Sequence, residues 1–212
     1  MLVPERVRTT FLKIIAPVIN FFIKRRLNPN HFTTIGLIVS IFAAYLFGSG
    51  RLRWGGLVML IGGLFDVIDG RVARATNRVT KFGALYDSTL DRYSEVMIFF
   101  GLAYYFVTVP WQSGDINVSL IAAIAVSVAI GGSIMTSYVR ARAEGLGLEC
   151  KVGVMQRTER VLFISLGALI HNVALVVAIF LVAIFSNITA IQRVYHVWLT
   201  ERRKGNPPAK GN

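Results

Sequence analysis

The stretch FDVIDGRVARATNRVTKFGALYDSTLD, residues 65–91, holds four carboxylates between two apolar runs. They belong to Asp66, Asp69, Asp87 and Asp91, and basic residues lie among them. An ionisable side chain within a membrane span costs roughly 2.5–3.5 kcal/mol on insertion scales, so it points to a function by default. These four carboxylates are therefore the first candidates for chemistry in this chain.

Helical spacing sorts the four carboxylates into two pairs. Asp66 and Asp69 are three residues apart and Asp87 and Asp91 are four apart, so each pair shares one helix face. A short basic loop joins the two helices, which predicts antiparallel neighbours whose acids converge. Converging anions need a cation, and hard oxygen ligands favour Mg²⁺ or Mn²⁺. Two such ions would balance four carboxylates and would suit phosphoryl transfer, since they can clamp both the attacking and the leaving oxygen.

Small and basic residues beside the acids fit a substrate that carries phosphate. Gly70 follows Asp69 directly and leaves room for a ligand to approach the backbone, and Ala73 is small. Arg74 lies about one turn beyond Asp69 and can bind phosphate oxygens. Gly83 opens the next predicted helix where two helices must pass closely.

The residues alone leave two alternatives open. Intramembrane acids also form proton or cation pathways, which would make the chain a cation-coupled transporter. They can also belong to an ion-pair network that serves only the structure.

Composition predicts an all-α integral membrane bundle. Of the 212 residues 54% are hydrophobic, the mean hydropathy is +0.59 and only 16% are charged. A soluble surface needs roughly 25–35% charged residues. Long apolar runs instead predict six transmembrane helices, at about 32–48, 52–74, 83–109, 119–144, 159–170 and 173–199.

The segments around these spans divide the chain into three parts. Residues 1–31 intermix basic and apolar residues and predict an amphipathic helix in the membrane interface, with a soluble amphipathic helix as the alternative. Residues 32–200 form the six-helix domain. Residues 201–212, ERRKGNPPAKGN, read as a disordered basic tail.

Positive charge predicts the orientation in the membrane. The net charge is +12, but the basic residues lie between apolar spans, so we expect membrane topology rather than nucleic acid to explain it. All of the 23 Lys and Arg residues except Arg51 and Arg53 fall on one side of the predicted spans. This places both termini and the four acids on the cytoplasmic side of a multi-pass protein of the cell (inner) membrane. The single cysteine, Cys150, excludes an internal disulfide framework.

The full pattern resembles the signature of the CDP-alcohol phosphatidyltransferases. It reads D-x-x-D-G-x-x-A-R, then eight residues, then G-x-x-x-D-x-x-x-D, and every fixed position matches. The element NPNHFTTIG, residues 28–36, also resembles the family. The resemblance implies an enzyme, a homodimer among membrane lipids, that joins a CDP-activated lipid to a hydroxyl acceptor and releases CMP.

The resemblance also implies roles for individual residues. Asp66, Asp69 and Asp87 would ligate two Mg²⁺ or Mn²⁺ ions with Asp91 beside them, and Asp91 would be the general base that takes the acceptor's proton. The CDP-lipid pocket would be lined by Gly70, Ala73, Arg74, Thr80 and Thr33.

Arginines are the best guide to the acceptor. Arg92 in DRYSE resembles the group of the family that uses inositol phosphate. Arg140 in SYVRARAE, Arg157 in QRTER and Arg193 in IQRVYHVW resemble elements of prokaryotic phosphatidylinositol-phosphate synthases that hold the acceptor's phosphate. The alternative is that they are ordinary cytoplasmic charges.

The resemblance therefore implies transfer from CDP-diacylglycerol to inositol phosphate. Glycerol 3-phosphate and free inositol are alternative acceptors for the same chemistry, and a cation-coupled transporter is the alternative from a different class.

Overall fold

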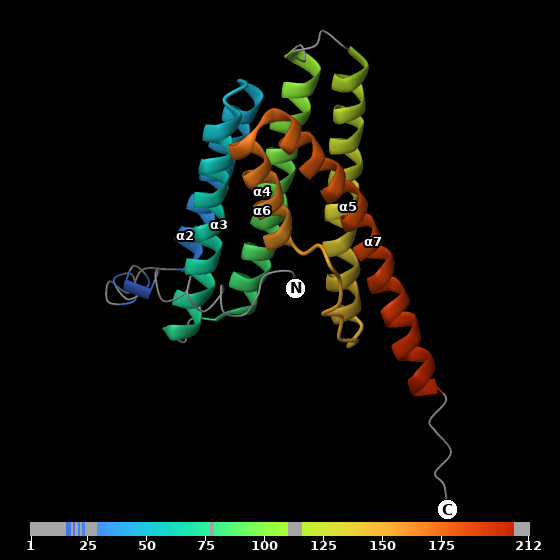
Figure 1. Cartoon of the computed structure of the whole chain (residues 1–212). Helices are drawn as coiled ribbons and strands as arrows, with labels where there is room; N and C mark the ends of the chain where they lie inside the picture. The colour runs from blue at the N-terminus through green and yellow to red at the C-terminus, as the bar shows by residue number, and fades with distance from the viewer. Residues whose placement is uncertain are drawn as a thin grey trace, which may run out of the picture.

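The protein is a bundle of long helices, shown by a computed structural model in Figure 1. The structure describes residues 16, 17, 19, 21, 23, 29–76, 79–109 and 116–205, apart from the side chains at 69, 73, 116, 117 and 203–205. Within this part of the chain there are helices and no strands. The helices are α2 (Pro29–Gly48), α3 (Leu52–Ala75), α4 (Lys81–Thr108), α5 (Ile116–Gly145), α6 (Arg157–Ile170) and α7 (Asn172–Gly205).

Local sequence signals explain where several helices begin and end. Gly50 has a φ of +76°, a conformation that glycine adopts without strain, and it turns the chain from α2 into α3. Thr80 caps α4 by accepting a hydrogen bond from the backbone N–H of Gly83, at 2.9 Å. Gln156 and Glu159 form a capping box at the start of α6. The helices confirm the predicted segments, with ends that differ by a few residues.

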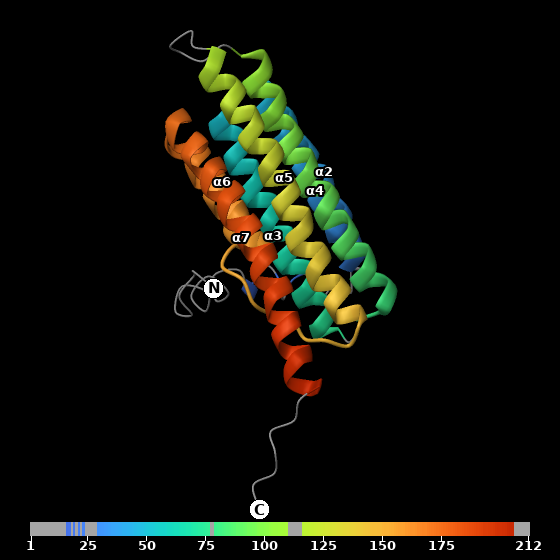
Figure 2. The same ribbon diagram turned by 90° about the vertical axis from the view of Figure 1, so that its right-hand side faces the viewer.

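The connections alternate between the two ends of the bundle. In Figures 1 and 2 the end of α3, the start of α4, the α5–α6 loop and the C-terminal end of α7 lie at one end of the bundle, and the α2–α3 turn lies at the other. Helix α2 packs against α3 and α4, α5 packs against α4 and α7, and α6 packs against α3 and α7. Helices α3 and α4 run in opposite directions, as predicted, but they are not packed neighbours, because α2 lies against both of them. The last part of α3 and the first part of α4 still lie at the same end of the bundle.

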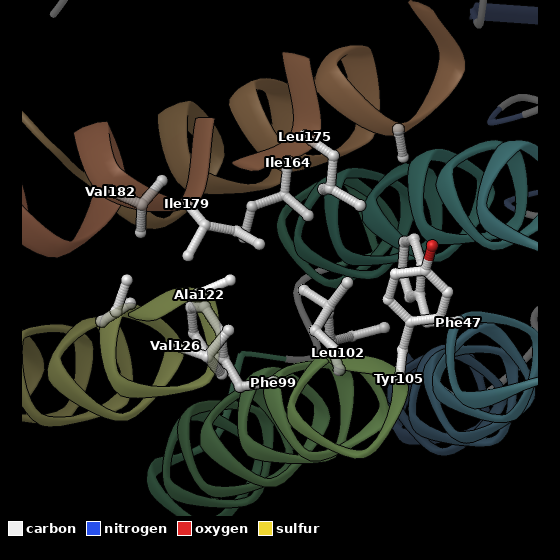
Figure 3. Packing of buried hydrophobic residues seen from close by; sticks show 14 of the residues in the cluster. Phe47, Phe99, Leu102, Tyr105, Ala122, Val126, Ile164, Leu175, Ile179 and Val182 are labelled. Atoms are coloured by element: carbon white, nitrogen blue, oxygen red, sulfur yellow. The ribbon is translucent and has the colours of Figure 1, made fainter. Parts of the chain in front are cut away.

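The apolar core fills the middle of the bundle. Figure 3 shows side chains from α2, α4, α5, α6 and α7 meeting between the helices, among them Phe47, Phe99, Leu102, Tyr105, Val126, Ile164, Leu175, Ile179 and Val182. On α4 these core residues begin about two turns beyond Asp91. The polar and apolar parts of the bundle thus follow one another along the same helix.

Three of the described helices are long and apolar enough to cross a membrane: Pro29–Gly48, Val118–Gly145 and Asn172–Arg202. Helices α3 and α4 carry the charged residues of the motif. Helix α6 has 14 residues, which at 1.5 Å each span about 21 Å, less than the roughly 30 Å of the hydrocarbon layer. Crossing by α3, α4 and α6 therefore stays a prediction.

The C-terminal boundary differs from the one expected. Helix α7 continues to Gly205, so residues 201–205 are helical where a disordered tail was predicted. The rings of Tyr195 and Trp198 stack with centroids 5.7 Å apart, and the Arg202 guanidinium lies 5.3 Å from the Trp198 ring. Such neighbours on one helix face extend the helix. Residues 206–212 and most of 1–31 lie outside the described residues.

Helix α4 crosses α2 so closely at Gly101 that a methyl group there would overlap the carbonyl oxygen of Ala44. We expect Gly101→Ala to lower the free energy of unfolding by about 1–3 kcal/mol, as overpacking does. The matched control is Gly131→Ala in α5, where no described atom lies within 4 Å of the added methyl. It should raise stability by up to about 1 kcal/mol, because alanine favours the helix. Unfolding in detergent measures both, and a Gly101→Ala protein as stable as Gly131→Ala would contradict the close crossing.

Candidate active site

Two motif carboxylates from different helices meet a single guanidinium. Nη1 of Arg157 lies 2.5 Å from Oδ2 of Asp66 on α3 and 2.7 Å from Oδ1 of Asp91 on α4. The three side chains are 26%, 21% and 16% exposed, so the cluster is mostly shielded from water. The predicted convergence of acids from the two helices is confirmed for this pair.

The remaining two acids lie on neighbouring turns. Asp87 is one turn before Asp91 and within electrostatic range of Asp66, Asp91 and Arg157. Asp69 follows Asp66 on α3, and its side chain is not among those described. Asp66, Asp87 and Asp91 thus lie at one place.

The donor chemistry of this cluster fits a hard divalent cation. Among the described side chains, no three of His, Cys, Asp or Glu lie close enough together to hold a metal ion. The Asp69 side chain is not one of those described, so this finding does not apply to it. Carboxylate oxygens are the ligands that Mg²⁺ and Mn²⁺ prefer. The bridging position of Arg157 shows that the acids attract a positive charge between them. The residues therefore suit Mg²⁺ or Mn²⁺.

Helix α2 packs closely against the parts of α3 and α4 that carry the acids. A methyl group at Gly36 would lie 3.3 Å from Oδ1 of Asp66, tighter than most such contacts. The hydroxyls of Thr34 on α2 and Tyr86 on α4 are 3.0 Å apart and share a hydrogen bond. These contacts give a structural reason for the small residue in the NPNHFTTIG element, because α2 must approach Asp66 closely.

Of the residues predicted to bind the CDP-lipid, Arg74 and Gly70 lie against each other on α3, whereas Thr80 and Thr33 make hydrogen bonds with the backbone. The Arg74 guanidinium folds back over Gly70, so that a methyl group at Gly70 would lie 3.4 Å from Nη2. Thr80 serves as the cap of α4. Thr33 is 5% exposed, and its hydroxyl donates to the carbonyl of Pro29 at 3.4 Å. The Ala73 side chain lies outside the described ones.

The three arginines predicted to bind the acceptor phosphate occupy different surroundings. Arg157 lies among the acids, between Asp66 and Asp91. Nε of Arg140 pairs with Glu144 at 2.8 Å on an exposed face of α5. Arg193 is 3% exposed and donates to the carbonyls of Val152 at 2.9 Å and Thr136 at 2.5 Å. Arg193 thus fastens the α5–α6 loop to α7 and α5. Of the other two arginines, Arg140 lies within electrostatic range of it.

Sequence reasoning missed one pair of residues at this site. Arg160 donates from Nε and Nη2 to the two carboxylate oxygens of Glu95, at 2.5 and 3.0 Å. Glu95 lies one turn beyond Asp91, and Arg160 lies one turn beyond Arg157. The spacing was a visible signal, because Glu95 continues the four-residue period of the acids on α4.

Known proteins are similar to this chain in both sequence and fold. The model of the CDP-alcohol phosphatidyltransferase family matches residues 26–199. The archaetidylinositol phosphate synthase of Methanothermobacter thermautotrophicus is 36% identical over 201 residues, covering 91% of this chain and 96% of the relative. The phosphatidylinositol phosphate synthase of Mycobacteroides abscessus is 33% identical over 196 residues, covering 90% and 86%.

Solved structures agree with the sequence relatives. The crystal structure of Mycobacterium tuberculosis phosphatidylinositol phosphate synthase with CDP-DAG bound superposes with a TM-score of 0.77 at 31% identity, covering 94% of this chain and 98% of that one. The same enzyme in complex with manganese and citrate gives a TM-score of 0.75 at 31% identity, covering 92% and 91%. The matched region contains the whole acid motif and α2 to α6, and on this evidence the chain belongs to the CDP-alcohol phosphatidyltransferase family.

Proposed function

We propose that this membrane protein transfers the phosphatidyl group from CDP-diacylglycerol to inositol phosphate, giving phosphatidylinositol phosphate and CMP. The observation that carries the proposal is the bridge from Arg157 to Asp66 and Asp91, because it joins an anion-binding group to the acids of the family motif. The relatives support the acceptor, since their names share inositol phosphate. A related structure contains CDP-DAG, which supports the donor.

Asp66, Asp69, Asp87 and Asp91 hold two Mg²⁺ or Mn²⁺ ions in this proposal. When bound, the ions supply positive charge to the diphosphate of the donor. The hard oxygen donors on α3 and α4 support this assignment, as does the manganese complex of the Mycobacterium tuberculosis enzyme.

The donor's diphosphate lies along the end of α3. Arg74 binds its oxygens, because a guanidinium matches a phosphate with two parallel hydrogen bonds. Gly70 and Ala73 leave room for the diphosphate against the helix. In this proposal Thr80 and Thr33 border the diphosphate from the start of α4 and from α2, and each side chain also makes a local hydrogen bond with the backbone.

Transfer needs one base and one leaving group. Asp91 takes the proton from the acceptor hydroxyl, whose oxygen then attacks the phosphorus nearer the lipid. The bond between this phosphorus and the bridging oxygen breaks, and CMP leaves with that oxygen. Asp91 suits this role because it lies at the site between the two helices and is 16% exposed.

Arginines hold the phosphate of the acceptor beside Asp91. Both ion pairs of Arg157 use Nη1, and a guanidinium carries five N–H donors, so other donors can face a phosphate. Arg140 lies at the surface of α5, where a soluble acceptor arrives. Arg193 completes the set from α7, where it also holds the loop that leads into α6.

The membrane arrangement follows from the same distribution of charge. We propose six spans with an amphipathic N-terminal helix in residues 1–31, a catalytic domain in 32–200 and a basic tail beyond the end of α7. Both termini and the active site face the cytoplasm at the cell membrane, and two copies form a homodimer. The end of α3, the start of α4, the α5–α6 loop and the end of α7 lie at the same end of the bundle. This supports the orientation, because these basic segments then lie on one side of the membrane.

The lipid of the donor has a second candidate. Two archaeal relatives that are 36% and 38% identical are named archaetidylinositol phosphate synthases. A donor with archaetidyl chains is therefore a specific alternative to CDP-diacylglycerol, with the same acceptor and the same chemistry.

An acceptor panel with purified protein and Mg²⁺ tests the proposal. Inositol phosphate, free inositol and glycerol 3-phosphate are each supplied with CDP-diacylglycerol or its archaetidyl counterpart, and CMP release is measured. We expect inositol phosphate to give the fastest release. Faster use of another acceptor would overturn the acceptor assignment, and cation flux without CMP release would show a transporter.

Removal of a metal ligand should abolish turnover. We expect Asp87→Asn to lower activity by more than about 100-fold. Even the mutation of residues that only hydrogen-bond to metal ligands typically lowers metal affinity or activity about 10–100-fold. Mn²⁺ titration should show weaker binding in this variant. Excess chelator should abolish the activity of the wild-type enzyme, and undiminished activity in chelator would disprove the metal-dependent mechanism.

Replacement of the base should slow transfer without loss of donor binding. We expect Asp91→Asn to reduce kcat by ~10²–10⁴-fold, the usual contribution of a positioned base. CDP-diacylglycerol binding and metal occupancy are measured on the same sample. A loss of less than about tenfold with full metal occupancy would place the base elsewhere.

Acceptor binding should depend on Arg140 and not on its exposed neighbour. We expect Arg140→Gln to raise KM for inositol phosphate by roughly tenfold, the lower end for a lost charge-assisted hydrogen bond. KM for CDP-diacylglycerol should stay constant. Arg142→Gln, two residues along α5 and also exposed, is the matched control. Equal effects of the two substitutions would mean that Arg140 is only a topological charge.

A further inference from the structure

A buried ion pair lies directly behind the active site. Arg160 is 1% exposed, and its guanidinium makes a two-pronged contact with Glu95. Its third nitrogen, Nη1, donates to the carbonyl of Met155 at 3.2 Å. All three nitrogens of Arg160 are therefore engaged, and neither residue belongs to the family motif described above.

This pair repeats the contact of Arg157 with Asp91 one helical turn deeper. Glu95 follows Asp91 by four residues on α4, and Arg160 follows Arg157 by three on α6. Of the ion pairs between described residues, these two join α4 to α6. Helix α6 otherwise packs along α3 and α7. Two stacked ion pairs thus contribute to the position of its first turn relative to α4.

Glu95 also competes for Arg157. The Arg157 guanidinium lies within electrostatic range of Glu95 as well as of Asp66 and Asp91. Arg160 occupies both oxygens of Glu95, and a carboxylate bound in this way offers little to a second cation. Without Arg160, an unpaired buried carboxylate would lie one turn from the acids and draw Arg157 towards itself.

We propose that Glu95 and Arg160 are positioning residues for the transfer reaction. The pair fixes the first turn of α6 against α4 and leaves Arg157 available to Asp66, Asp91 and the acceptor phosphate. The inference rests on the proposed function, because it gives Arg157 its role on the acceptor.

A role in stability alone predicts a different result. Replacing a buried ion pair by uncharged residues is often neutral for stability, whereas removing one partner leaves a buried charge unpaired. The two roles can therefore be separated by kinetics on folded protein, with the melting temperature of every variant measured in the same detergent.

Three variants separate the contributions of the pair. Arg160→Met leaves Glu95 free to capture Arg157, and we expect KM for inositol phosphate to rise at least about tenfold. Glu95→Gln/Arg160→Met removes the competing charge and should recover most of this loss, a non-additive result. Arg160→Lys keeps Glu95 neutralised without the two-pronged contact, so its KM should lie between those of the wild type and Arg160→Met. KM for CDP-diacylglycerol should stay within about twofold throughout.

The control is an exposed ion pair outside the site. Glu149 and Lys151 pair on the exposed α5–α6 loop, where the ammonium lowers the pKa of the Glu149 carboxyl. Glu149→Gln should leave both KM values unchanged. If Arg160→Met fails to fold, the double variant and Arg160→Lys decide, because each avoids an unpaired buried charge.

Two results would overturn the positioning role. One is an unchanged acceptor KM in every folded variant. The other is a loss of rate that follows only the folded fraction, with both KM values constant. A wild-type enzyme that does not use inositol phosphate would refute the proposed function instead, and the same comparison would then be made with the acceptor that it does use.

Discussion

Repulsion between carboxylates is the constraint on which this structure depends. Two like charges 4 Å apart cost about 4 kcal/mol at the effective dielectric constant of roughly 20 that suits protein sites. Asp66, Asp87 and Asp91 lie within electrostatic range of one another, and Glu95 follows on the next turn. Positive charge from elsewhere in the fold offsets this repulsion, because Arg157 contacts Asp66 on α3 and Asp91 on α4.

The short helix α6 supplies that charge, although its N-terminal end is an unfavourable position for cations. Arg157 and Arg160 lie in its first turn, where the helix dipole disfavours cations. The capping box of Gln156 and Glu159 stabilises this helix end. The loop before it is fastened to α7, since the Met155 N–H donates to Thr189 and Arg193 donates to Val152. The cations stay in place because backbone contacts, and not only their charges, hold the first turn.

Much of this arrangement could be predicted from the sequence, because it depends on local periodicity. The spacing of Asp66, Asp87 and Asp91 indicated their helix faces, and the apolar runs indicated the helices themselves. The pair of Glu95 and Arg160 could not be predicted in the same way. These residues are 65 positions apart, and which cation reaches which acid depends on how α6 packs.

Arg193 shows the same limit from the other side. Its sequence context resembled that of a phosphate-binding residue, and this role stays a prediction. Context could not reveal its burial or the two backbone carbonyls to which its guanidinium also donates. The boundary of α7 was also missed, because the helix gains contacts between Tyr195, Trp198 and Arg202 after its apolar run has ended.

The separation of polar and apolar parts along α4 explains how one helix can serve both stability and chemistry. From Ile98 onward its buried face belongs to the core, so the helix is anchored over its second half. Its first half is left to carry Asp87, Asp91 and Glu95 on one face. Gly36 and Gly101 let α2 approach the acids on α3 and the anchored half of α4. The acids are thus held by rigid helices at the end of the bundle, where a lipid donor can enter from the membrane and a phosphorylated acceptor from water.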